Sequence, residues 1–120
     1  MIGFETKNGI LCADDVPLTH IAEDIGTPTY VYSSSQIHAN IDTLRNALTA
    51  TLPADRQPLI AFACKSNDHL AILSLMASRG LGADVVSGGE LKKALKAGID
   101  SQKIVFSGVG KTDEEISFAI

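Results

Sequence analysis

The second half of the chain contains three short apolar runs, at residues 58–64, 81–86 and 103–107, with amphipathic segments between them. Short runs that are apolar at nearly every position are typical of strands covered on both faces in a parallel sheet. Their centres recur about every 22 residues, a spacing that suits repeated βαβ units. The pattern predicts an α/β fold with a parallel sheet and right-handed crossovers.

Helix start and stop signals lie after each apolar run. Asp68 is expected to cap a helix that Gly80 ends, and Gly98 ends the next one. Two further caps have a glutamate three residues after a hydroxyl side chain, which is the spacing of a capping box. These pairs are Ser87 with Glu90 and Thr112 with Glu115.

The opening of the chain predicts a β-hairpin. Asn8-Gly9 separates two short runs, residues 4–7 and 10–12, and both turn residues tolerate the positive φ that a two-residue hairpin loop requires. A short helix is expected next, over residues 19–25, with Thr19 as its cap and Gly26 as its end.

Residues 28–32 (PTYVY) are β-branched and aromatic, so we expect a strand there. Ser33 and Gln36 then have capping-box spacing. The helix that follows them has an apolar stripe at helical period, formed by Ile37, Ile41, Leu44, Leu48 and Leu52.

Two folds accommodate three βα units, an open doubly wound sheet and a (β/α)₈ barrel. A complete barrel takes about 250 residues, whereas this chain has 120. The chain also stops inside a helix that has just begun, at TDEEISFAI. We therefore expect a fragment of a longer protein.

Composition excludes several classes of partner. The net charge is −4 with no basic stripe, which gives no field for a nucleic-acid backbone. No apolar run approaches the roughly 20 residues that cross a bilayer, and the N-terminus lacks a secretory signal pattern. We expect a cytoplasmic protein with reduced cysteines. His20, His38 and His69 lack metal-ligand spacing and are interpreted as surface or packing residues.

Lys65 directly follows the first apolar run and is the leading candidate for chemistry. Strand alternation would place Ala61, Ala63 and Lys65 on one face, with Phe62 and Cys64 on the other. A lysine that ends a buried strand is costly without a charge partner, a wet pocket or a chemical role. Partial desolvation would favour the neutral amine, a nucleophile for aldehydes. From position alone, a lysine that reaches solvent and pairs with a carboxylate is the favoured interpretation.

Asp84 lies inside the second apolar run, where an unpaired carboxylate is expensive. It could pair with Lys65 or with a ligand cation, and a structural ion pair or a backbone contact explains it equally well.

Ser87-Gly88-Gly89 could offer bare N–H groups to an anion, although a simple helix cap is the favoured interpretation. The SGVG turn after the third run is equally ambiguous. By alternation Cys64 points away from Lys65, as a small buried hydrophobe.

Three stretches of this chain resemble the diaminopimelate decarboxylase family of barrel-fold pyridoxal-phosphate enzymes. They are AFACKSN, GLGADVVSGGELKKALKAG and KIVFSGVGKTDEEI, and the opening IAEDIGTPTYVYS resembles the entry segment of that family. The resemblance covers nearly the whole chain. It implies the first βα units of a TIM-type barrel at residues 33–120. It also implies that residues 1–32, with the hairpin, associate with a second, all-β domain.

The resemblance also implies which residues serve the cofactor. The cofactor lysine falls on Lys65, the alanine that lines the cofactor ring falls on Ala63, and the acidic residue of the second strand falls on Asp84. Glu90 matches a family glutamate and is retained as a cap. Cys64 and Ser66 replace the commoner valine and alanine on either side of the lysine.

The implied activity is decarboxylation of the amino acid meso-diaminopimelate to L-lysine, with pyridoxal 5′-phosphate as cofactor, in a homodimer. The glycine-rich phosphate loop, the acidic partner of the pyridine nitrogen, the substrate arginine and a cysteine segment from the second subunit would lie beyond Ile120. The chain alone is therefore expected to be inactive. A non-catalytic or regulatory relative is the alternative. A racemase of the same fold is disfavoured, because KSNDHL lacks the continuation that racemases show after the lysine.

Overall fold

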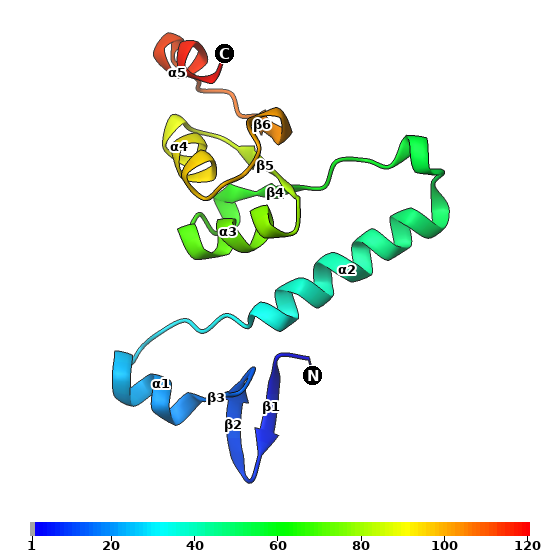
Figure 1. Cartoon of the computed structure of the whole chain (residues 1–120). Helices are drawn as coiled ribbons and strands as arrows, with labels where there is room; N and C mark the ends of the chain where they lie inside the picture. Colours follow the sequence, from blue (N-terminus) through cyan, green and yellow to red (C-terminus); the bar gives the residue numbers. More distant parts are fainter. Residues whose placement is uncertain (1) are drawn as a thin grey trace. The chain divides into compact units, whose positions relative to one another are not determined.

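The computed structural model describes residues 2–120, which divide into two compact units (Figure 1). The first unit ends at Gln57 and the second spans Pro58–Ile120. The assignment of residues 33–120 to one barrel domain, and of residues 1–32 to a segment of another, stays a prediction.

The first unit has a small antiparallel sheet in the order β1-β2-β3, followed by two helices. The predicted hairpin is confirmed, since φ is 51° at Asn8 and 82° at Gly9 in its turn. The elements of this unit are β1 (Phe4–Lys7), β2 (Ile10–Ala13), β3 (Val16–Pro17), α1 (Leu18–Ile25), α2 (Ser34–Thr51) and the 3₁₀ helix η1 (Ala54–Arg56).

Two predictions for the first unit are wrong. Helix α1 begins at Leu18, with Pro17 as its N-cap residue, so Thr19 lies inside the helix and does not cap it. Proline suits a helix entry because it has no N–H to leave unpaired. Residues 28–32 form no strand. A strand requires a ladder partner, and in this unit residues 4–17 supply all three strands of the sheet.

Asp14 joins the β2–β3 turn to the start of α2. Its carboxylate accepts hydrogen bonds from the hydroxyl groups of Ser33 (2.7 Å), Ser34 (3.2 Å) and Ser35, and from the Ser34 N–H (3.1 Å). These bonds, the one from Ser35 first, lower the pKa of Asp14 to about 2. Ser33 caps α2 as predicted, since its hydroxyl accepts the Gln36 N–H at 3.0 Å.

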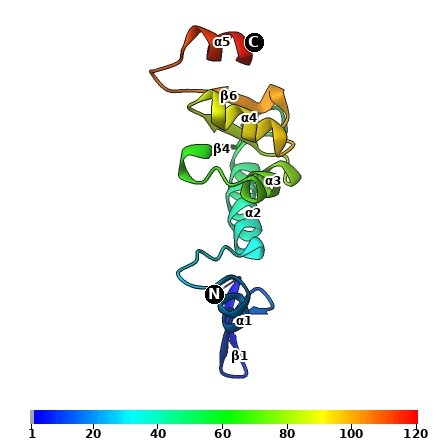
Figure 2. The same cartoon turned by 90° about the vertical axis from the view of Figure 1, so that its left-hand side faces the viewer.

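The second unit is a parallel three-stranded sheet in the order β4-β5-β6, with helices between consecutive strands. This confirms the predicted α/β class, and Figures 1 and 2 both show α3 and α4 beside the strands. The elements are β4 (Ala61–Ala63), the 3₁₀ turn η2 (Cys64–Ser66), α3 (Leu70–Ser78), β5 (Gly82–Val85), α4 (Gly88–Lys96), the 3₁₀ turn η3 (Ser101–Lys103), β6 (Ile104–Phe106) and α5 (Asp113–Ala119).

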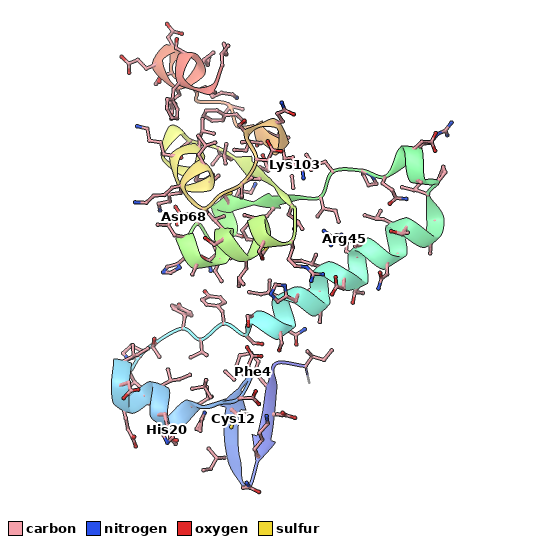
Figure 3. All side chains as sticks on the ribbon, in the orientation of Figure 1. Phe4, Cys12, His20, Arg45, Asp68 and Lys103 are labelled. Atoms are coloured by element: carbon pink, nitrogen blue, oxygen red, sulfur yellow. The ribbon has the colours of Figure 1, made fainter. Side chains whose placement is uncertain are left out.

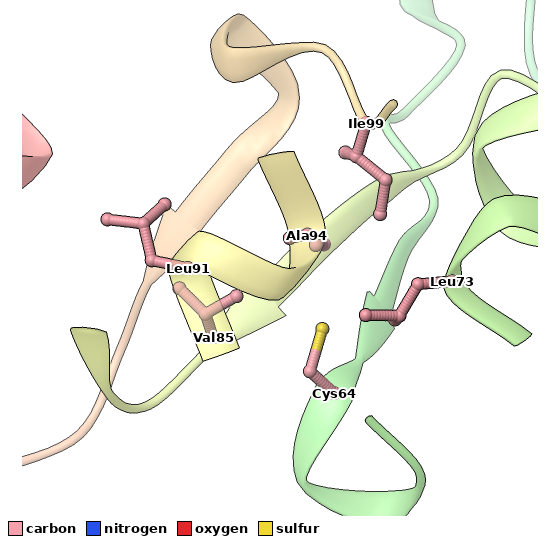
Figure 4. Packing of buried hydrophobic residues seen from close by; sticks show 7 residues of the cluster. Cys64, Leu73, Val85, Leu91, Ala94 and Ile99 are labelled. Carbon is pink, nitrogen blue, oxygen red and sulfur yellow. The ribbon is translucent and has the colours of Figure 1, made fainter. Parts of the chain in front are cut away.

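The hydrophobic core of this unit lies between the sheet and helices α3 and α4 (Figure 4). Its fully buried members include Leu73, Ala83, Val85 and Ala94, and Phe62, Ile104 and Phe106 pack against them. Because strand side chains alternate, the residues between these positions face away from the core. The register Ala63↔Asp84↔Val105 places those three side by side on the opposite face of the sheet.

Gly82 allows β5 and β6 to begin close together. A Cβ atom at this position would lie 2.1 Å from the carbonyl oxygen of Lys103, the residue just before β6. No side chain fits in that space, so glycine is required here by close approach of backbone.

The start of α3 differs from the prediction. His69, not Asp68, is the N-cap, and its Nδ1 accepts the Ala71 N–H at 3.2 Å. Asp68 instead pairs with Lys93 on α4, with 2.5 Å between Oδ2 and Nζ. Asn67 helps to fix the helix entry, because its side-chain oxygen accepts the His69 N–H at 3.1 Å.

Candidate functional site

The carboxyl ends of β4, β5 and β6 lie at one edge of the sheet, since the strands are parallel and adjacent. In parallel α/β folds this edge carries the functional groups. Two residues labelled in Figure 3 help to locate this edge. Asp68 follows the turn after β4 and lies at the carboxyl edge, whereas Lys103 directly precedes β6 and lies at the opposite edge.

Lys65 lies in the 3₁₀ turn η2, immediately after β4. The expectation that it continues the strand alternation of Ala61 and Ala63 is wrong, because the backbone leaves the strand at Cys64. The Lys65 side chain is exposed. Among residues 2–120 its amine forms neither an ion pair nor a hydrogen bond. The ion pair between Lys65 and a carboxylate, which the position of Lys65 in the sequence favoured, is therefore not present among these residues.

The turn that carries Lys65 is fixed on both sides. The Ser66 hydroxyl donates to the Ala63 carbonyl at 2.7 Å, and the Asn67 N–H donates to the Cys64 carbonyl at 3.1 Å. The Asp68–Lys93 ion pair then joins the end of this segment to α4. The backbone of Lys65 is thereby held while its side chain stays unpartnered.

Cys64 faces the core, away from this edge (Figure 4), as predicted. It is fully buried. Burial raises the pKa of its thiol to about 11, and the nearby carboxylates of Glu90, Asp84 and Asp68 add to the shift. The thiol therefore stays protonated at neutral pH and is no nucleophile, because the thiolate is the reactive form.

Asp84 is half-buried on the face of β5 that points away from the helices. Its Oδ1 accepts a hydrogen bond of 2.5 Å from the Ser107 hydroxyl. Pairing with Lys65 is not seen among the described residues. Ser107 was missed by sequence reasoning, although alternation from Val105 places it on the same face as Asp84.

The Ser87-Gly88-Gly89 turn serves as a helix cap, as favoured from sequence. The Ser87 hydroxyl accepts the Glu90 N–H at 3.2 Å, while the Glu90 carboxylate accepts the Val86 N–H at 2.8 Å. The Gly88 N–H donates to Glu115 Oε1 at 2.7 Å. An anion would therefore have to displace a carboxylate of the chain itself from the start of α4.

Glu115 also completes the capping box with Thr112 that the sequence predicts at the start of α5. Hydrogen bonds from the N–H groups of Gly88 and Thr112 lower the pKa of the Glu115 carboxyl. One carboxylate thus stabilises the starts of two helices.

Lys111 closes the SGVG turn that follows β6. Its ammonium group donates to the carbonyl oxygens of Gly108 (2.7 Å) and Ser107 (3.4 Å) and lies 5.3 Å from the centre of the Phe106 ring. Sequence reasoning did not identify this contact.

The carboxyl edge of the sheet offers an amine to a ligand, whereas the described residues hold no cluster of metal ligands. A primary amine can condense with an aldehyde, and the alanines at 61 and 63 add no bulk on the face of the sheet opposite the core. Within residues 2–120, no group of three or more His, Cys, Asp or Glu side chains could hold a metal ion. None of the helices described is both long enough and apolar enough to cross a membrane.

Residues 34–120 match the family model described as the pyridoxal-binding domain of pyridoxal-dependent decarboxylase. Diaminopimelate decarboxylase of Zymomonas mobilis is 49% identical over all 120 residues, and that of Pseudomonas fluorescens is 47% identical over the same length. In each case the chain covers 28% of the relative. The chain thus spans little more than a quarter of the length of the curated relatives it matches.

Solved structures show the same similarity. Diaminopimelate decarboxylase from M. jannaschii has a TM-score of 0.91 and 41% identity, over 98% of this chain and 27% of that one. A co-complex of the M. jannaschii enzyme with L-lysine has a TM-score of 0.87 and 40% identity, over 99% of this chain and 28% of that one. The three parallel strands and their helices correspond to the N-terminal part of these barrel-fold enzymes.

Proposed function

The chain belongs to the pyridoxal-dependent decarboxylase family, and on that basis we propose that it is part of a diaminopimelate decarboxylase in which Lys65 binds the cofactor covalently. The cofactor is pyridoxal phosphate. The substrate is meso-2,6-diaminopimelate, which the enzyme converts to L-lysine and carbon dioxide. Relatives named diaminopimelate decarboxylase, at 49% and 47% identity, support a catalytic protein over a non-catalytic relative.

The observation that carries the assignment of Lys65 is its combination of a fixed backbone and an unpartnered amine. The η2 turn is held by hydrogen bonds at Ser66 and Asn67, and no group among the described residues competes for the amine. A primary amine is the group that forms a Schiff base with an aldehyde.

The other two assigned residues lie beside this turn. Ala63 directly precedes η2 and pairs in register with Asp84 on β5. A side chain as small as alanine leaves room for a planar ring, and Asp84 supplies a negative charge next to it. Bound pyridoxal phosphate supplies the electron sink for loss of carbon dioxide, while Lys65 holds the cofactor in place before substrate binds and after product leaves.

The remaining proposals concern the whole protein. We expect a cytoplasmic homodimer, in which other parts of the enzyme complete the site. The 120 residues alone correspond to 28% of the first relatives, so we expect them to release no carbon dioxide above background from diaminopimelate. Measured turnover by the purified chain would contradict this.

The test of Lys65 is chemical trapping in the complete enzyme. Borohydride reduction should fix the cofactor on the peptide that contains Lys65, as identified by mass spectrometry. Lys65→Ala should lose the visible absorption of the bound cofactor. Lys96→Ala is the matched control, since Lys96 is an exposed lysine at the end of α4, and it should keep that absorption. A label on another lysine would overturn the assignment.

A further inference from the structure

Asp84 uses one carboxylate oxygen within the chain and leaves the other available. Oδ1 accepts the Ser107 hydroxyl at 2.5 Å, and Oδ2 accepts no hydrogen bond from the residues that the structure describes. The side chain lies between Ala63 and Val105 in the sheet register, on the face that helices α3 and α4 do not cover. Ala63 and Val105 are apolar and cannot orient the Asp84 carboxylate by hydrogen bonding. The hydrogen bond from Ser107 orients it instead.

Ser107 is itself held in place by its backbone. Its N–H donates to the Val85 carbonyl at 2.9 Å, which extends the pairing of β5 with β6 by one residue. Its carbonyl oxygen accepts from Lys111 at 3.4 Å. The hydroxyl therefore projects from a fixed point, and its single proton is committed to Asp84.

We propose that Ser107 is a positioning residue for the cofactor site, which fixes Oδ1 of Asp84 so that Oδ2 remains free for the bound cofactor. The proposal rests on the function proposed above, in which Asp84 lies beside the cofactor. A hydroxyl that donates to a carboxylate forms a charge-assisted bond, which is shorter and stronger than a neutral one. Without it the Asp84 side chain is free to adopt other rotamers.

The experiment compares Ser107→Thr with Ser107→Val in the holoenzyme. Threonine and valine have the same shape, but only threonine keeps the hydroxyl. The readouts are cofactor affinity and visible circular dichroism of the bound cofactor, which reports on its orientation. We expect Ser107→Val to bind cofactor about 10-fold more weakly, the size expected for a lost hydrogen bond to a charged group, and to change the dichroism. Ser107→Thr should restore both.

Ser78→Ala is the matched control, because the Ser78 hydroxyl donates only to a carbonyl within α3, at 2.8 Å. It should bind cofactor as the wild type does. Ser107→Ala, which adds no bulk, provides the same comparison if the valine variant fails to fold.

A double-mutant cycle with Asp84→Asn tests whether Ser107 acts through Asp84. If it does, removal of the hydroxyl has a smaller effect in the Asp84→Asn variant than in the wild type. Additive effects, or a Ser107→Val variant with unchanged affinity and dichroism, would overturn the proposal. Failure of the proposed function is distinguishable from either result, because it would appear as retention of the cofactor band by Lys65→Ala.

Discussion

Gly82 shows how the absence of one side chain determines the distance between two strands. It pairs with Ala61 on one side and approaches the Lys103 carbonyl on the other. The residues that follow it, Ala83 to Val85, carry both the core contacts and Asp84. The position of the candidate site therefore depends on this close backbone approach.

Gly82→Ala should destabilise the chain severely. The added Cβ would lie 2.1 Å from a backbone oxygen, so β5 and β6 must separate, and overpacking of this kind costs about 1–3 kcal/mol or more. Gly89→Ala is the control, since its Cβ would meet only the Ser87 hydroxyl at 3.7 Å, and it should change stability by less than about 1 kcal/mol. Urea unfolding measures both, and equal midpoints for the two variants would refute the steric argument.

At the scale of elements, polar links join consecutive βα units at the carboxyl edge of the sheet. Asp68 joins the segment after β4 to α4, Ser107 joins the end of β6 to β5, and Glu115 joins α5 to the start of α4. Each link connects segments that are 23 to 27 residues apart. The edge that we propose as the cofactor site is therefore held by side chains as well as by the backbone hydrogen bonds of the sheet.

Glu115→Gln should lower the melting temperature at neutral pH. Hydrogen bonds from two N–H groups lower the pKa of Glu115 from its ordinary value of 4.5. The charged carboxylate therefore stabilises the fold above pH 4.5, and that contribution is lost as the pH falls through the lowered pKa. The melting temperatures of wild type and Glu115→Gln should accordingly converge in acid.

Glu114→Gln is the matched control for this titration, because Glu114 lies on the same helix and is exposed. Its melting temperature should follow that of the wild type across the pH range. A constant gap between wild type and Glu115→Gln from neutral pH into acid would contradict the role assigned to the charge.

The sequence predicts those elements that local rules determine. Hydroxyl caps at Ser33, Ser87 and Thr112 and the parallel strands are confirmed, because a cap and a buried strand both depend on residues close in the chain. The cap at His69 was not predicted, since Asp68 is the better cap by residue type. The helix begins at Leu70, so His69 is its N-cap, and Asp68 pairs with Lys93 on α4.

The candidate site was predicted less completely than the fold, because its side-chain contacts join residues that are far apart in the sequence. Lys65 became a candidate because it directly follows an apolar run. Its 3₁₀ turn has no hydrophobic signal, so the strand was expected to continue through it. Ser107 and Glu115 act on residues more than 20 positions away. No pattern within a short window reveals such contacts.

At the scale of the molecule, the parallel sheet of the second unit has surfaces suited to association. Within residues 2–120, β4 and β6 each pair with one strand only, so both present unpaired backbone groups that can template further pairing. Val105 on β6 is 49% exposed on the face that α3 and α4 do not cover. We expect the purified chain to self-associate through this sheet.

Val105→Lys should shift the chain towards monomer, because a charge on an exposed strand disfavours pairing with a second copy. Val16→Lys is the matched control, since Val16 is a strand valine of nearly equal exposure, 48%, in the first unit, and it should leave the association unchanged. Light scattering over a concentration series measures both variants. If the wild-type chain is monomeric at every concentration, or if the two lysine variants behave alike, then the sheet of the second unit is not the surface through which copies associate.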